Sequence, residues 1–188
     1  MALACAPIAT LALAAGKKEV AQKPKVQLTT SLGTIVLQLD AKRAPKTVAN
    51  FLRYVREGFY KGTIFHRVIS NFMLQGGGFD TKRKKKKTHD PIQNEADNGL
   101  KNAVGTVAMA RTGDPHSASA QFFINVKNNS FLNFRSKNQR GWGYTVFGKV
   151  IKGMDVVKKI KAVPVRNEGG PFANMPVTPV VITNARLL

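Results

Sequence analysis

Cysteine is nearly absent from this 188-residue sequence, in which Cys5 is the single example. One cysteine cannot form an internal disulfide or a cysteine metal site. The three histidines, His66, His89 and His116, lack metal-ligand spacing, so we expect neither a metal nor another cofactor. Acidic residues are also scarce, because ten Asp and Glu accompany thirty Lys and Arg and leave a formal charge of +20. Such a charge favours anionic partners but carries little information about the fold.

Several signatures of chemistry are missing as well. The sequence shows no catalytic triad, no phosphate-binding loop and no paired carboxylates, so none of these common catalytic designs is expected. It also shows no internal repeat and no regular alternation of strands with helices. The length is that of one domain with a substantial core.

The first fifteen residues are almost wholly apolar and small. Met1–Ala15 resembles the apolar region of a secretory signal, with Ala12-Leu13-Ala14 as a small-x-small cleavage site, and it is too short to span a bilayer. No Lys or Arg precedes it, so either the true start lies upstream or the segment is not a signal. We expect a signal-like segment at 1–15, a linker at 16–25 and a folded domain at 26–188. Export to the periplasm is the expected location, and the cytoplasm is the alternative.

Hydrophobic periodicity predicts about eight short strands and two helices. The runs 26–30 and 34–39 form a predicted hairpin, in which Ile35, Leu37 and Leu39 share one face. Apolar residues at helical spacing predict helices over 45–57 and 154–160. Many short strands with Gly-rich turns favour a sandwich or a closed barrel.

One stretch, IFHRVISNFMLQGGG over residues 64–78, combines an arginine with bulky apolar side chains. On a regular strand, positions two apart share a face, so Phe65 and Arg67 should point the same way, as should Met73 and Gln75. Arginine is seldom buried unless it is paired. Arg67 is therefore either an edge-strand arginine with its head in water or part of a site.

A basic run follows, made of six consecutive cationic residues: Lys82, Arg83, Lys84, Lys85, Lys86 and Lys87. These residues would repel one another and cannot be buried, so a solvated, mobile loop is one interpretation. Contact with nucleic acid or with an anionic surface of the cell envelope is the other. No RNA-binding aromatic signature is interleaved with the lysines, so we expect the envelope surface as the partner.

Four motifs together resemble the cyclophilin family of peptidyl-prolyl isomerases. They are FHRVISNFMLQGG (65–77), GTVAMA (105–110), SAQFFI (119–124) and YTVFGKVIKGMDVV (144–157), in the family's order and spacing. The resemblance covers about residues 26–188, and NEADNGLKN (94–102) fits the bacterial exported type. It implies a mainly β fold, namely a closed eight-stranded antiparallel barrel capped by two α-helices, with the active groove on its outer face.

The resemblance also implies roles for particular residues. Arg67 falls on the catalytic arginine. The positions of the proline-ring pocket are Phe72, Met73, Phe123 and Leu132, and the positions that contact substrate backbone are Gln75, Ala110 and Gln121. Three groove positions depart from the eukaryotic pattern and fit the bacterial type. Phe131 occupies a position where eukaryotic cyclophilins often have Trp, Tyr144 one where they have His, and Arg111 one where they have Asn. Weak cyclosporin binding is expected from these departures.

Isomerisation of an Xaa-Pro bond breaks no covalent bond, so an enzyme must favour the twisted amide over both planar forms. A guanidinium aimed at the proline nitrogen would do so, and Arg67 suits this role because it stays charged. The expected function is therefore prolyl isomerisation of proline-containing polypeptides during folding of exported proteins, by a monomer. A proline-binding chaperone with little catalysis and a basic nucleic-acid or envelope-binding protein are the alternatives.

Overall fold

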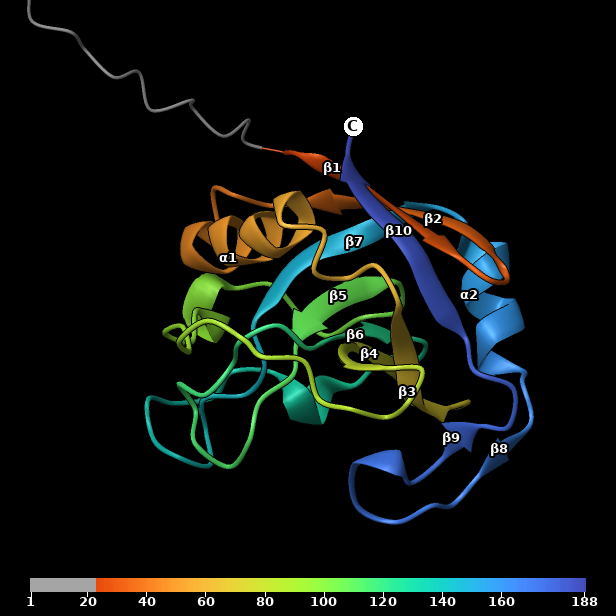
Figure 1. Cartoon of the computed structure of the whole chain (residues 1–188). Helices are drawn as coiled ribbons and strands as arrows, with labels where there is room; N and C mark the ends of the chain where they lie inside the picture. Colours follow the sequence, from red (N-terminus) through yellow and green to blue (C-terminus); the bar gives the residue numbers. More distant parts are fainter. Residues whose placement is uncertain (1–22) are drawn as a thin grey trace, which may run out of the picture.

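The computed structural model describes residues 23–188, so the signal-like segment 1–15, Cys5 and most of the linker 16–25 lie outside the described residues. Within this part, eight strands close an antiparallel barrel in the order β1-β10-β3-β4-β6-β5-β7-β2 (Figure 1). The strands are β1 (Lys25–Thr30), β2 (Gly33–Leu39), β3 (Thr63–Ile69), β4 (Met73–Asp80), β5 (Thr106–Met109), β6 (Phe122–Asn125), β7 (Val146–Lys152) and β10 (Val181–Leu187). The expected closed barrel is confirmed.

Two α-helices, α1 (Pro45–Arg56) and α2 (Met154–Lys161), pack on opposite sides of this barrel (Figure 1). Pro45 occupies the start of α1, where its missing N–H costs nothing. Ala44 precedes the helix and its side chain makes no capping hydrogen bond. Instead, the Glu95 carboxylate accepts hydrogen bonds from the backbone N–H groups of Lys46 (3.0 Å) and Thr47 (2.8 Å). A negative charge at this end also suits the helix dipole. This contact joins α1 to a distant loop.

Side chains fill the barrel interior. Phe65, Phe122 and Phe147 are fully buried there, and Phe51 from α1 packs against Phe122 with ring centroids 5.6 Å apart at 89°. An interior packed in this way leaves no channel for a ligand. Any binding site for a polypeptide must therefore lie on the outside of the barrel.

Short elements complete the fold. The 3₁₀ turns are η1 (Ala96–Asn98), η2 (Ser130–Leu132) and η3 (Gly170–Phe172), and β8 (Val165–Arg166) pairs with β9 (Met175–Pro176) as a separate two-stranded sheet. Across residues 23–188, every helix is too short or too polar to cross a membrane.

A β-bulge in β3 overturns the expected arrangement of Phe65 and Arg67. Phe65 pairs with Gly76 and Arg67 with Gln75, so His66 is an extra residue opposite β4. Phe65 lies in the barrel core, whereas Arg67 lines a cavity outside it. A bulge reverses the side-chain alternation of a strand and re-aims the residues that follow it. The prediction that these two side chains share a face is therefore wrong.

The basic run forms a turn whose backbone is hydrogen-bonded to β4. The Asp80 carboxylate accepts hydrogen bonds from the backbone N–H groups of Lys82 (2.8 Å) and Lys84 (2.9 Å). The Lys86 ammonium donates to the Phe59 carbonyl and lies 4.5 Å from the centre of its ring. The run is thus a hydrogen-bonded turn with mostly exposed side chains.

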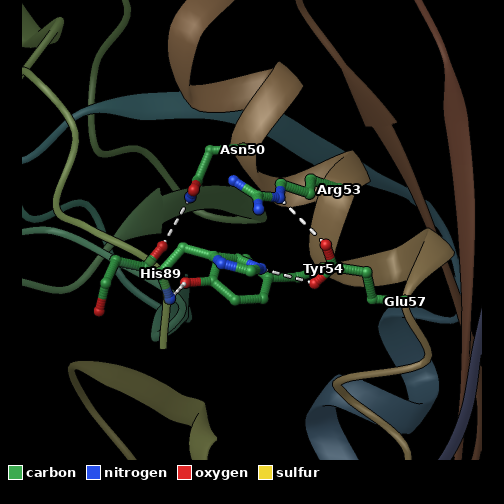
Figure 2. A network of polar contacts seen from close by, with 6 residues as sticks. Asn50, Arg53, Tyr54, Glu57 and His89 are labelled. Atoms are coloured by element: carbon green, nitrogen blue, oxygen red, sulfur yellow. Dashed lines mark hydrogen bonds and ion pairs between the residues drawn. The ribbon is translucent and has the colours of Figure 1, made fainter. Parts of the chain in front are cut away.

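Figure 2 shows how the chain after the basic run is fastened to α1. The His89 ring nitrogen Nε2 lies 2.7 Å from Glu57, and the His89 backbone N–H donates to the Tyr54 hydroxyl at 2.9 Å. Arg53 holds the same carboxylate from the other side at 3.0 Å. The hydrogen bond from His89 is the main cause that lowers the pKa of Glu57. These contacts fix the far end of the basic run.

Candidate active site

A cavity of about 500 Å³ lies on the outer face of the barrel, over β3, β4 and β6. Ten of the eleven residues that the sequence resemblance implies for the site line this cavity: Arg67, Phe72, Met73, Gln75, Ala110, Arg111, Phe123, Phe131, Leu132 and Tyr144. They come from segments spread over almost eighty residues of chain. The barrel brings them together because β4 and β6 are neighbours.

The floor of the cavity is apolar and belongs to a cluster separate from the barrel core. Met73, Phe123 and Leu132 are buried in it together with Ala108 and Val146. Met73 and Gln75 both face this cavity, as alternation on β4 predicts, while Leu74 between them points into the core. An apolar floor of this kind can hold a small hydrophobic ring away from water.

Arg67 stands at the edge of the apolar floor. It is half-buried and lies opposite Gln75 across the β3–β4 ladder. Within residues 23–188, its guanidinium takes part in none of the ion pairs. A guanidinium is always protonated and carries five N–H donors. Arg67 therefore offers unpaired donors beside an apolar surface.

Gln121 is the one implied site residue that does not line the cavity. It lines an adjoining hollow of about 210 Å³, and its Oε1 accepts a hydrogen bond from Gln75 Nε2 at 2.9 Å. Gly78 makes room for it, because a Cβ there would lie 2.4 Å from Gln121 Cγ. Gln121 is thus placed to orient Gln75. Lys85 from the basic run lines the same hollow.

Arg111, Tyr144 and Phe131 form the rim. The Arg111 guanidinium lies 4.6 Å from the centre of the Tyr144 ring and donates to the Gly143 carbonyl at 2.9 Å. Phe131 is 66% exposed and stacks on Phe72 at 5.6 Å. An apolar ring so exposed is available to contact a bound chain. The weak cyclosporin binding expected from this rim stays a prediction.

Three buried asparagines support the cavity, and sequence reasoning missed them. Asn129 Nδ2 donates to the Phe72 carbonyl at 2.9 Å and to Asn125 Oδ1 at 2.7 Å. Asn102 Nδ2 donates to the Leu132 carbonyl at 3.2 Å, and its Oδ1 accepts from Asn125 Nδ2 at 3.2 Å. This chain of bonds fixes the backbone of two walls of the cavity. The only signal for these residues in the sequence is that asparagines lie next to the end of a strand, as in INVKNN (124–129).

The segment Gly170–Ala173 also lines the cavity, and no expectation from the sequence placed it in the site. It reaches the site because Phe172 packs on Phe79 and His66 outside the barrel. No motif marked it. His66 itself is buried beside Arg67, and burial lowers its pKa to about 4.

Comparisons with known proteins identify the family. The model of the cyclophilin type peptidyl-prolyl cis-trans isomerase/CLD family matches residues 25–187. The chain is 62% identical over 163 residues to peptidyl-prolyl cis-trans isomerase cyp18 of Streptomyces antibioticus, which covers 87% of this chain and 98% of that protein. It is 56% identical over 157 residues to peptidyl-prolyl cis-trans isomerase B of Escherichia coli. This match covers 84% of this chain and 95% of that protein.

Solved structures agree. The crystal structure of a cyclophilin type peptidyl-prolyl cis-trans isomerase from Cryptosporidium parvum matches with a TM-score of 0.72 at 26% sequence identity, and covers 88% of this chain and 98% of that one. A crystal structure of the same protein in the presence of the dipeptide ala-pro matches with a TM-score of 0.71. This chain therefore belongs to the cyclophilin family, and it is a peptidyl-prolyl cis-trans isomerase.

Proposed function

We propose that the cavity lined by Arg67 is the catalytic groove and that Arg67 stabilises the twisted Xaa-Pro amide. Rotation of a planar amide is opposed by about 18–20 kcal/mol, because the nitrogen lone pair is delocalised into the carbonyl. In the twisted state the lone pair returns to the proline nitrogen, which then becomes a hydrogen-bond acceptor. Arg67 donates to that nitrogen and so favours the twisted state over both planar isomers.

The apolar floor and the polar groups beside it supply the remaining stabilisation. An acceleration of about 10⁵ requires roughly 7 kcal/mol, whereas one hydrogen bond from a charged group contributes about 1.5–3 kcal/mol. Met73, Phe123 and Leu132 hold the proline ring, while Gln75 and the backbone at Ala110 anchor the substrate chain. The substrate is thereby held while its amide rotates, which is a gain from orientation.

The single observation that carries this proposal is the position of Arg67. The bulge at His66 turns Arg67 out of the barrel core and onto the apolar cavity. Among the described residues no carboxylate forms an ion pair with it there. A structural arginine would be expected to have such a partner. A guanidinium kept unpaired beside an apolar floor is suited to a transient acceptor.

The proposal predicts that Arg67→Ala loses at least 90% of the activity, or about tenfold, the equivalent of about 1.4 kcal/mol. Arg67→Lys should be similarly poor, since an ammonium lacks the planar fork. The measurement is cis-trans exchange of an Xaa-Pro peptide by NMR. Arg56→Ala is the matched control, because Arg56 is exposed on α1. Turnover close to that of the control by a folded Arg67→Ala protein would refute the mechanism.

We also propose that the enzyme acts on exported proteins in the periplasm. The support is the apolar run at 1–15 with its small-residue cleavage motif, and the lack of cysteine after Cys5. N-terminal sequencing of the native protein from a cell-envelope fraction tests this. Recovery from the cytosol with Met1 in place would contradict it.

A further inference from the structure

A second cavity, of about 330 Å³, lies on another part of the barrel wall. Strands β2, β5 and β7 and the segment before β5 form it, and it shares no lining residue with the groove. Its lining consists of Lys23, Gln38, Leu39, Asp40, Arg43, Leu100, Lys101, Ala103, Thr106, Val146, Gly148 and Lys149. Apart from Val146, which is buried in the apolar cluster under the groove, none of these residues takes part in prolyl isomerisation as described above.

Gly148 lies in the wall of this cavity. The register between β5 and β7 shifts at Phe147, since Val107 pairs with Gly148 and Ala108 with Val146. A Cβ on Gly148 would lie 2.7 Å from the Gln38 carbonyl oxygen and 2.9 Å from Leu39 Cδ2. No side chain fits at this position, so β7 packs closely on β2 along this side of the cavity. The cavity is part of the barrel wall rather than a gap between loops.

The cavity combines an apolar floor with a cationic border. Leu39, Leu100 and Val146 supply apolar lining, and Leu100 and Val146 pack in the same cluster as the floor of the groove. Four cations, Lys23, Arg43, Lys101 and Lys149, border the cavity and are exposed.

One carboxylate, Asp40, faces these four cations. Its Oδ1 already accepts the backbone N–H of Arg43 at 3.1 Å, and its Oδ2 lies 3.9 Å from Arg43 Nε. Throughout residues 23–188, Lys23, Lys101 and Lys149 take part in none of the ion pairs. The border therefore has an excess of unpaired positive charge above an apolar floor, an arrangement that favours an anion with an apolar body.

We propose that this cavity is a second ligand site, for a small organic anion that carries an aromatic or aliphatic body and a carboxylate, sulfonate or phosphate group. Small-molecule cavities are mostly apolar with a few placed polar groups, and measure about 300–1,000 Å³. A peptide strand is a poorer occupant, because β2, β5 and β7 are all paired on both sides in the closed barrel and offer no free edge. The anionic group lies among Lys101, Lys149 and Lys23, and the body lies on Leu39 and Leu100.

The test uses 8-anilinonaphthalene-1-sulfonate, which joins an aromatic body to a sulfonate and fluoresces in apolar surroundings. The full protein should bind it, and the neutral N-phenyl-1-naphthylamine should bind at least fivefold more weakly. The double variant Lys101→Gln/Lys149→Gln should raise the dissociation constant of the sulfonate about fivefold or more, the range for two partly exposed charge contacts. Lys158→Gln/Lys159→Gln on α2 removes the same charge elsewhere and should leave it unchanged.

Two further measurements locate the probe. Amide NMR shifts should centre on Leu100, Thr106 and Gly148, and an excess of a short Ala-Pro peptide should leave the probe bound. Displacement by the peptide, or shifts confined to Phe123 and Tyr144, would put the probe in the groove and overturn the proposal. If the two double variants weakened binding of the probe equally, net charge would account for the effect, and the proposal would be overturned as well. None of these readouts depends on the role of Arg67.

Discussion

His66 is a buried polar residue next to the proposed catalytic arginine. It is 1% exposed and packs edge-on against Phe79, with ring centroids 4.8 Å apart. Its Nδ1 has no hydrogen-bond partner among the described residues. Desolvation is the first cause that lowers its pKa from 6.5 to about 4, and the nearby Arg67 charge adds to it. The folded protein therefore keeps this imidazole neutral.

This pKa predicts how stability depends on pH. Between about pH 6.5 and about pH 4, the unfolded chain binds a proton at this ring and the folded protein does not. The free energy of unfolding must then fall as the pH drops through this window, and level off below it, by up to about 3 kcal/mol from this residue. Urea denaturation at pH 7 and pH 4.5 measures the loss.

The matched variant is His66→Leu, which removes the titrating ring and keeps an apolar side chain of similar size. Between pH 7 and pH 4.5, its free energy of unfolding should fall by less than that of wild type. The difference should be most of the loss of about 3 kcal/mol that is expected from His66. Other titrating groups, such as the Glu57 carboxylate, contribute equally to both proteins and cancel in the comparison. Parallel losses in the two proteins would mean that His66 is protonated in the folded state.

At the scale of elements, hydrophobic periodicity predicted most of the fold. The face shared by Ile35, Leu37 and Leu39 is buried in β2, and the stripe of the first predicted helix faces the core. Periodicity failed in β3, where it assigned Phe65 and Arg67 to one face. A bulge depends on which residues of the partner strand form the ladder. That information lies in β4 and cannot be read from residues 63–69 alone.

The motifs indicated where the candidate site lies, although only Arg67, Met73, Gln75 and Phe123 of its eleven residues lie within strands. Ten of the eleven residues line one cavity, and Gln121 lies just outside it. Asn102, Asn129 and the Gly170–Ala173 segment were not predicted. Their contribution depends on contacts to residues far away in the chain, such as the bond from Asn129 to Phe72. Such contacts exist only after the barrel has closed.

The contacts that hold the basic run in place also could not be read from its own composition. Its composition favours a mobile loop, yet one carboxylate, that of Asp80, accepts two of its backbone N–H groups. Asp80→Ala removes both bonds, so the run should open locally more often, and trypsin should cut between 82 and 88 about tenfold faster. A tenfold change corresponds to about 1.4 kcal/mol, within the range for two exposed charge-assisted bonds. Mass spectrometry of early fragments gives the cleavage sites.

Asp80→Asn keeps an oxygen acceptor at the same position and serves as the control. It should be cut at a rate close to that of wild type, while the melting temperature of both variants stays near the wild-type value. If Asp80→Ala is cut no faster than wild type, other contacts hold the run. The ion pair of Arg83 with Glu168 at 2.6 Å would then be the next contact to remove.

At the scale of the whole molecule, the charge of +20 acts over distances longer than any single contact. Within the basic run, Lys85 lines the hollow beside the groove, and Arg83 and Lys86 are engaged with Glu168 and Phe59. Lys82, Lys84 and Lys87 are exposed and form no ion pair among the described residues. These three side chains are available to a partner without disturbing the groove.

We propose that these three lysines draw the enzyme to anionic membrane surfaces. Each lysine near such a surface contributes about 1 kcal/mol, so Lys82→Gln/Lys84→Gln/Lys87→Gln should weaken binding to vesicles containing phosphatidylglycerol at least tenfold. The attraction is screened over about 8 Å at physiological ionic strength, so wild-type binding should fall steeply with added salt and variant binding less so. Vesicle co-sedimentation at several salt concentrations measures both.

The control for this test is Lys152→Gln/Lys158→Gln/Lys159→Gln, which removes three exposed charges from β7 and α2. If net charge alone were responsible, the two triple variants would lose vesicle binding equally. Turnover of a short neutral Xaa-Pro peptide should be the same in all three proteins, because such a substrate gains nothing from long-range attraction. A loss of turnover in the basic-run variant would mean that its lysines act within the groove. Surface attraction and catalysis would then not be separable in this protein.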